Sequence, residues 1–510
     1  MRNELNKVLS TGYAKITEIL LLVLGQILII PLILSSWDAN LLGLWFTLIA
    51  TFQLIQLINL SHQVYLYNRA FIFNRKNKIK INQDIFSAIP ISLVISFLVV
   101  IFLLISFKFN IFGTLLNMDK IYLDDFNLGI IYLSILYFFT YSYGTFFYGP
   151  FSVFGYYAIY AWFKVLRAIC SSFFPAIYIY FGANFLEAVY ALIFSELLTF
   201  IIIAIYSKKI FNKLSFKFYK PNLKKGLNIL ISSSLILINY LIDFSKNMGL
   251  RIILAIIFSP LLVSYFVVLR VITNFIKFSM DSLRDPLHPK LMNSFQAKNK
   301  KNTLLIIEFY WLVSIFLICP MVVLIQIIMP YFFDVWTLGK LEFQPRLFSL
   351  LITSTLFYSV YLPFDMILKG LNENKKILYG SITSAIIFLF LILILFKYYS
   401  LVSVGFAILI SEIFLLTLYS YYIRNLFINK KIIFNYKLLI LTILFVINTC
   451  FITIFITYTG YTHKLFAYFL FSQVFLIFNA NKICSSELIE IFKYYLKKVF
   501  AKKKKNYEKT

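Results

Sequence analysis

Long apolar stretches recur along the whole chain, and they constrain its fold more than any other feature of the sequence. One of them, residues 385–396, reads AIIFLFLILILF and holds no charged residue. Of all 510 residues, 61% are hydrophobic, and the mean hydropathy is +0.85. This leaves too little polar surface for a water-soluble protein, whereas a bilayer requires none. The sequence therefore predicts an all-α integral membrane protein.

A membrane-spanning helix needs about 20 mostly apolar residues, and the sequence offers fourteen such segments. The fifth carries two cations, and the seventh is long and interrupted by DFSKNMGLR. We expect spans near residues 14–35, 41–65, 85–107, 126–148, 158–181, 185–206, 226–257, 261–283, 303–328, 346–368, 377–397, 401–422, 438–458 and 464–482.

The loops between these spans alternate in charge. Loops on one side are rich in Lys and Arg, as in RAFIFNRKNKIK and SKKIFNKLSFKFYKPNLKK, while those on the other are short and neutral to acidic, as in SSWDAN and FGANFLE. Cytoplasmic loops collect positive charge, so both termini are predicted to be cytoplasmic. The same rule accounts for the net charge of +27 without a nucleic-acid partner.

An internal repeat divides the predicted spans. The sequence around Ser195 reads ALIFSELLTF, and that around Ser411 reads AILISEIFLL, 216 residues later (411 − 195). The two Ser-Glu pairs lie in the sixth and twelfth spans, which suggests a duplicated six-helix unit. We expect two pseudo-symmetric six-helix lobes followed by an extra helix pair. The predicted parts are an N-terminal lobe (1–206), a basic linker (207–225), a C-terminal lobe (226–422), helices 13 and 14 (423–482) and a basic tail (483–510).

The pattern of six, six and two helices, together with several motifs, resembles the polysaccharide transport family. The motifs are GLWFTLIATFQLIQLINLSHQV in the second span, DPLHPKLMNSF after the eighth, ILKGLNENKK after the tenth and VSVGFAILISEIF in the twelfth. This family is the O-antigen and capsule-repeat flippase branch of the multidrug/oligosaccharidyl-lipid/polysaccharide exporter superfamily. The chain departs from it at Asn59-Leu60-Ser61, where members often have Asp-Leu-Gly.

The resemblance implies a transporter and not an enzyme. The implied function is flipping of undecaprenyl-pyrophosphate-linked repeat units across the bacterial inner membrane by alternating access, for O-antigen, capsule or exopolysaccharide synthesis. The implied partners are the lipid-linked oligosaccharide, membrane lipids and other polysaccharide assembly proteins, with the chain itself a monomer. Two alternatives stay open. A polymerase or other membrane-embedded glycan enzyme would need a large outer loop, and a cation-coupled multidrug exporter would favour an acidic cavity.

Charged residues within predicted spans are the candidates for a binding site, because each costs roughly 2.5–3.5 kcal/mol at a helix centre. Lys164 and Arg167 lie three residues apart, on one face of their helix. Snorkelling to the headgroups would also explain Lys164, but Arg167 lies deeper. Arginine offers phosphate a planar fork of donors, and lysine a mobile point charge. The predicted pyrophosphate site comprises Arg167, Arg270, Lys164, Arg251 and Lys246.

Intramembrane acids form a second set. Asp365, Asp243 and Glu308 are candidates for coupling to H⁺ or Na⁺, and Asp243 could instead pair with Lys246 three residues later. Glu196 and Glu412 occupy equivalent places in the repeat, which favours a structural role between helices. The four cysteines and three histidines are scattered, so neither a metal site nor a cofactor is expected.

Overall fold

The computed structural model describes residues 25–73, 77–116, 120–140, 156–246, 248–296, 300–371, 373–429 and 435–459, with a few single residues between and after these ranges. Within them every regular element is a helix. Ten helices are long and apolar enough to cross a membrane, or eleven if one bent pair counts as a single span. The predicted all-α membrane fold is confirmed. The predicted spans 14–35, 126–148 and 464–482 extend beyond the described residues, so the count of fourteen stays a prediction.

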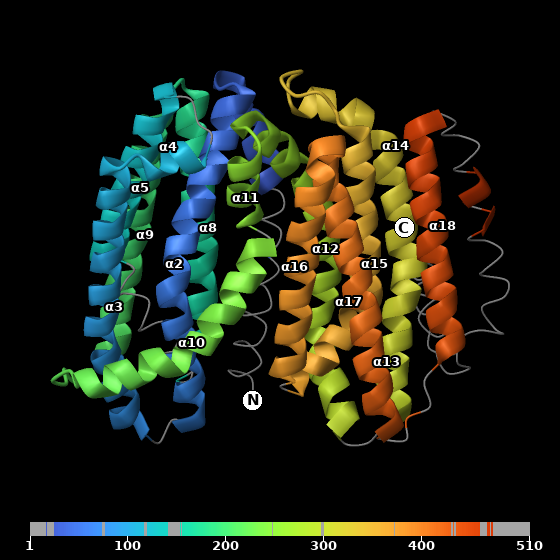
Figure 1. Cartoon of the computed structure of the whole chain (residues 1–510). Helices are drawn as coiled ribbons and strands as arrows, with labels where there is room; N and C mark the ends of the chain where they lie inside the picture. The colour runs from blue at the N-terminus through green and yellow to red at the C-terminus, as the bar shows by residue number, and fades with distance from the viewer. Residues whose placement is uncertain are drawn as a thin grey trace, which may run out of the picture. The chain divides into compact units, whose positions relative to one another are not determined.

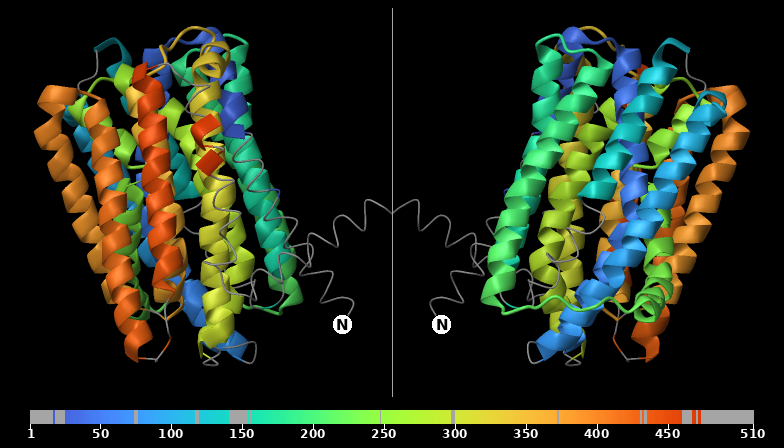
Figure 2. Two further views of the ribbon diagram at one scale, coloured as in Figure 1. Left: turned by 90° about the vertical axis from the view of Figure 1, so that its right-hand side faces the viewer. Right: turned by 90° about the vertical axis from the view of Figure 1, so that its left-hand side faces the viewer.

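The chain divides into two compact units, which are described separately. The first comprises residues 1–272 and 334–342, and the second comprises 273–333 and 343–510. Within each unit most of the helices run roughly side by side (Figures 1 and 2). The predicted lobes rest on the sequence repeat, and their boundaries stay a prediction.

The first unit contains the helices of the N-terminal half of the chain. After a helix at Gly25–Ser36 come α2 and α3, and α10 crosses both of them obliquely (Figure 1). The labelled helices are α2 (Ala39–Phe73), α3 (Lys78–Lys108), α4 (Ile111–Leu115), α5 (Lys120–Phe139), α8 (Tyr157–Tyr180), α9 (Phe185–Lys213), α10 (Leu223–Lys246), α11 (Leu250–Ile257) and the start of α12 (Pro260–Gln296).

Close backbone contacts fix this arrangement. A Cβ atom at Gly226 of α10 would lie 2.2 Å from the carbonyl oxygen of Ser87 in α3, and one at Gly43 of α2 would lie 1.9 Å from that of Pro260. Only glycine allows helices to approach so closely. A buried charge cluster holds α10 as well. The carboxylate of Asp84 in α3 lies 2.6 Å from Nε of Arg69 in α2 and also pairs with Lys225 in α10.

The second unit surrounds α15, which is buried along almost its whole length. Its buried serines and threonines, such as Ser354 and Ser359, donate to backbone carbonyls one turn earlier, so their hydroxyls do not need water. A π-helical segment precedes Pro320, whose missing N–H interrupts the helical hydrogen bonds. The elements are the rest of α12, α13 (Lys300–Val313), η3 (Ser314–Ile318), α14 (Cys319–Trp336), α15 (Pro345–Gly370), α16 (Asn374–Tyr399), α17 (Val402–Asn429) and α18 (Tyr436–Thr459).

The outer faces of several helices are apolar, as a lipid environment requires. On α3, the side chains of Phe97, Leu98 and Phe102 are more than half exposed, and on α16 so are those of Phe390 and Leu393. In water such continuous apolar surface would drive association, whereas in a bilayer it is the solvated face.

Candidate functional site

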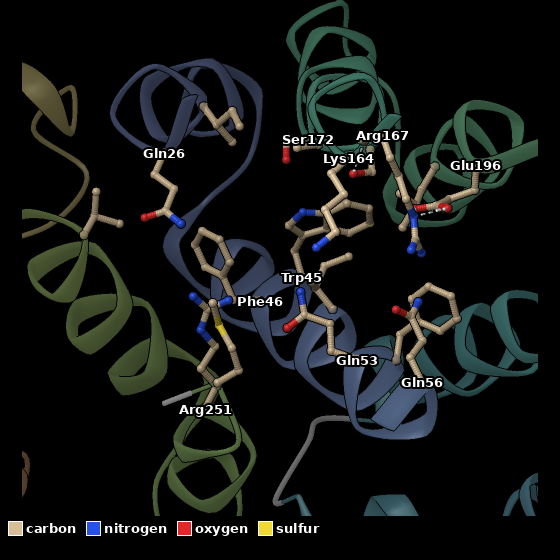
Figure 3. A pocket seen from close by; sticks show the side chains of 18 residues that line it. Gln26, Trp45, Phe46, Gln53, Gln56, Lys164, Arg167, Ser172, Glu196 and Arg251 are labelled. Atoms are coloured by element: carbon tan, nitrogen blue, oxygen red, sulfur yellow. Dashed lines mark hydrogen bonds and ion pairs between the residues drawn. The ribbon is translucent and has the colours of Figure 1, made fainter. Parts of the chain in front are cut away.

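A pocket of about 440 Å³ lies entirely within the first unit. Its walls come from α2, α8, α9, α11, the helix at Gly25–Ser36 and the start of α12 (Figure 3). The volume falls near the lower end of the range of about 300–1,000 Å³ that is typical of small-ligand sites. Charged and amide side chains lie in its wall beside aromatic ones.

Two of these walls are helix faces whose residues recur at helical spacing. On α8 the lining residues are Lys164, Arg167, Ala168, Ser171 and Ser172, at positions i, i+3, i+4, i+7 and i+8. This spacing places all five on one face of a single helix. We call Lys164 and Arg167 the cationic wall. Their position in the pocket agrees with the sequence pattern. A helix face that carries two charges is costly to expose to lipid, so it is expected to face a cavity.

Opposite the cationic wall lies a face of α2 that bears both aromatic and amide side chains. Trp45, Ile49, Gln53 and Gln56 line the pocket at positions i, i+4, i+8 and i+11, and we call them the α2 wall. In Figure 3, Lys164 and Arg167 extend from α8 toward Gln53 and Gln56. The pocket therefore presents positive charge on one side and neutral hydrogen-bonding groups on the other.

Arg167 has a counterion inside the pocket. Its Nε donates to Oε2 of Glu196 at 3.0 Å and to Oε1 at 3.3 Å. Glu196 comes from α9, 29 residues further along the chain, and its side chain is 4% exposed, against 30% for Arg167. The carboxylate is thus held from the buried side, while part of the guanidinium reaches open space. Arg167 combines a fixed position with access to a ligand.

The remaining lining cations interact with aromatic rings. Nζ of Lys164 lies 4.8 Å from the ring centroid of Tyr160, one helical turn earlier, and the guanidinium carbon of Arg251 in α11 lies 5.0 Å from that of Phe46. An aromatic face stabilises a cation without cancelling its charge. Among the described residues that line the pocket there are three cations and one carboxylate, a net charge of two positive. An anionic ligand would be attracted there.

The other predicted members of the cationic site lie elsewhere. Arg270 is buried in α12 and is not among the residues lining the pocket, although its neighbour Val271 is. Lys246 and Asp243 belong to the last turns of α10, and their side chains lie outside the described part of the structure. The structure therefore brings together Lys164, Arg167 and Arg251 of the five predicted cations.

The predicted coupling acids in the second unit each have a partner. Asp365 pairs with Lys369 one turn later, Oδ2 to Nζ at 2.7 Å, and the amide of Asn435 donates to Glu308 at 2.7 Å. Both carboxylates are buried, at 6% and 4% exposed. Intramembrane carboxylates can take part in proton or cation exchange, and this role stays a prediction for both acids.

Glu412, the repeat equivalent of Glu196, also pairs with a cation from another helix. Its Oε1 lies 2.8 Å from Nζ of Lys277 in α12, and Oε2 accepts a hydrogen bond from the hydroxyl of Tyr361 at 2.5 Å. Glu196 meets a cation of the fifth predicted span, whereas Glu412 meets one of the eighth. Equivalent acids thus pair with cations from non-equivalent spans, so the internal repeat does not extend to these two ion pairs.

Several pocket residues were not predicted from the sequence. They are the amides Gln26, Gln53 and Gln56 and the aromatic Trp45. A signal was present, since Gln53 and Gln56 interrupt the apolar run of TFQLIQLINL at a spacing of three, which places both on one face. The described residues hold no cluster of three or more His, Cys, Asp or Glu side chains placed to bind a metal ion.

No known protein-family model and no curated protein matches this sequence. Solved structures do match its fold. The lipid II flippase MurJ in an inward closed conformation superposes with a TM-score of 0.63 at 12% identity, over 94% of this chain and 100% of that one. An inward-facing multidrug resistance MATE family transporter of the MOP superfamily gives a TM-score of 0.58 at 16% identity, over 82% and 99%.

A third match is a MOP superfamily transporter from Pyrococcus furiosus, whose structure is described by a reversed polarity of the binding pocket. It gives a TM-score of 0.53 at 16% identity, over 83% of this chain and 96% of that one. At these identities the likeness concerns the fold alone, yet it spans most of both chains in each pair. The protein therefore has the fold of MOP-superfamily transporters, the fold that MurJ and the MATE transporters share.

Proposed function

We propose that this protein is a flippase that moves undecaprenyl-pyrophosphate-linked oligosaccharide repeat units across a bacterial inner membrane by alternating access, for O-antigen, capsule or exopolysaccharide synthesis. The observation that supports this most directly is the net positive pocket of the first unit, which is lined by Lys164, Arg167 and Arg251. A transporter fold provides a path across the membrane, and the positive charge of the pocket favours an anionic ligand.

The chemistry of the pocket suits a pyrophosphate. Arg167 can give phosphate oxygens two parallel hydrogen bonds, and Lys164 adds a mobile positive charge three residues away on the same face. The carboxylate of Glu196 holds Arg167 from the buried side. It also lowers the net charge, which favours release, because a site that transports must bind its ligand without retaining it.

Drug export is the second candidate, since MATE transporters share the fold. An exporter of cationic drugs needs an accessible carboxylate in its pocket. Among the described lining residues the carboxylate is that of Glu196, which is buried and bound to Arg167. The pocket thus favours an anionic ligand. In the proposed cycle, Asp365 and Glu308 are the candidate sites for a coupling H⁺ or Na⁺.

Delivery of lipid-linked repeats in a flippase-deficient cell tests the proposal. We expect Arg167→Ala and Lys164→Ala to lower delivery at least 10-fold at normal protein level, with repeats accumulating on the cytoplasmic face. Lys213→Ala, which removes an exposed cation at the end of α9 outside the pocket, is the matched control and should deliver normally. Normal delivery by both pocket variants would contradict the proposal.

A further inference from the structure

The amide side chains that line the pocket have no role in the proposed binding of pyrophosphate. Gln53 and Gln56 on α2 and Gln26 on the helix at Gly25–Ser36 all line the pocket. Within the described part of the chain none of the three side-chain amides makes a hydrogen bond to the protein, and the bond that Tyr137 donates goes to the backbone carbonyl of Gln56. Figure 3 shows all three side chains directed into the open space.

Each glutamine amide has two N–H donors and an oxygen that accepts two hydrogen bonds. Polar side chains are costly in a membrane helix unless they are satisfied by a neighbouring helix or by the contents of a cavity. Because these amides line the pocket and point into it, they are placed to hydrogen-bond a ligand that enters it. Neutral donors and acceptors can hydrogen-bond hydroxyl and acetamido groups, which are themselves uncharged.

A rigid aromatic surface adjoins these amides. The ring of Trp45 stands edge-on to those of Trp37 and Phe185, with centroids 6.0 Å and 6.1 Å away. Trp37 is itself fixed, because its Nε1 donates to the carbonyl oxygen of Ala183 at 2.8 Å. Trp45 therefore has one orientation before any ligand binds. Trp45 is 5% exposed, so only a part of its ring borders the pocket. That apolar part lies beside the neutral amides, as the apolar C–H face of a sugar ring adjoins its polar rim.

We propose that Gln53 and Gln56, with Gln26 and Trp45, form the subsite for the sugar that is joined directly to the pyrophosphate. The inference rests on the proposed function, because the cationic wall across the pocket must hold the phosphates. At about 440 Å³ the pocket accepts a pyrophosphate and one sugar but not a whole repeat unit. Selectivity among substrates thus lies in the first sugar, and the remaining sugars are not read by this pocket.

Binding to the purified full-length protein tests the subsite with three probes. They are undecaprenyl pyrophosphate without sugar, the same lipid with one N-acetylhexosamine, and the same lipid with one hexose. The wild-type protein should bind one of the sugar-bearing lipids about 3- to 10-fold more tightly than the bare lipid, as expected for one or two neutral hydrogen bonds. Gln53→Leu and Gln56→Leu should abolish that difference, so that each variant binds the sugar-bearing lipids no more tightly than the bare lipid.

The control variants separate this result from general damage. Gln83→Leu removes an amide that does not line the pocket and should change nothing, whereas Lys164→Ala should weaken binding of all probes alike. Gln53→Asn, which keeps the amide but shortens the side chain, replaces Gln53→Leu if that variant does not fold.

The outcomes also distinguish the two proposals. If the wild-type protein binds all three probes equally, or if the glutamine variants weaken binding of the bare lipid as much as that of the sugar-bearing ones, the sugar subsite is wrong and the flippase proposal stands. If the wild-type protein binds none of the probes, the proposed function itself fails, and the subsite fails with it.

Discussion

The ion pair between Arg167 and Glu196 allows transport and stability to be measured separately. Two unit charges 3.0 Å apart attract by about 5 kcal/mol at an effective dielectric constant near 20. Desolvation of the buried carboxylate opposes this attraction, and water reaches Arg167, whose side chain is 30% exposed. We therefore expect Arg167→Ala to destabilise the protein by about 2–3 kcal/mol, mostly because Glu196 is left as an uncompensated buried charge.

This loss predicts a melting temperature lower by about 2–5 °C in detergent, since the entropy of unfolding grows with the size of the unit that unfolds. Combining Arg167→Met with Glu196→Leu should restore it, because replacing a buried ion pair with apolar residues of similar volume is often neutral or stabilising. Transport should not return, because the cation proposed to bind phosphate is still missing. The assay compares melting temperature with delivery of lipid-linked repeats for both single variants and the double variant. Wild-type delivery by the double variant would refute the reasoning and make the pair a purely structural contact.

Two further predictions concern packing in the first unit. Asp84→Leu should lower the free energy of unfolding by about 2–3 kcal/mol, and with it the melting temperature, because it leaves Arg69 and Lys225 without their shared carboxylate. An unchanged melting curve would contradict the role of this cluster. Gly43→Leu should abolish accumulation of folded protein, because its Cβ would lie 1.9 Å from a backbone oxygen that cannot move away; normal yield and a normal elution profile on size-exclusion chromatography would disprove that contact.

Hydropathy and spacing were enough to predict the helical membrane fold and some of the residues that line the pocket. Lys164 and Arg167 could be placed on one face because the α-helix fixes the direction of residues three apart. The same reasoning could not supply the counterion of Arg167, since Glu196 is brought to it by the packing of α8 on α9. Sequence spacing within one helix carries no information on such a contact.

The cations on other helices show the same limit. Arg251 and Arg270 both lie in predicted spans, and only packing decides that Arg251 lines the pocket while Arg270 is buried outside its lining. The glutamines were overlooked for a different reason. They carry no charge, so a search for costly intramembrane groups that starts from lysine, arginine and acids passes over Gln53 and Gln56.

The membership of residues 334–342 in the first unit has a consequence for biosynthesis. Nε1 of Trp336 donates to the carbonyl oxygen of Ile27 at 2.7 Å, and Nζ of Lys340 donates to that of Trp37 at 3.0 Å. The ribosome makes these donors some 300 residues after their acceptors, when most of α12, α13 and α14 has already been synthesised. The unit that holds the pocket therefore reaches its final structure late in translation. A nascent chain stopped before Asp334 would carry every residue that lines the pocket but not the contacts that complete the surrounding unit.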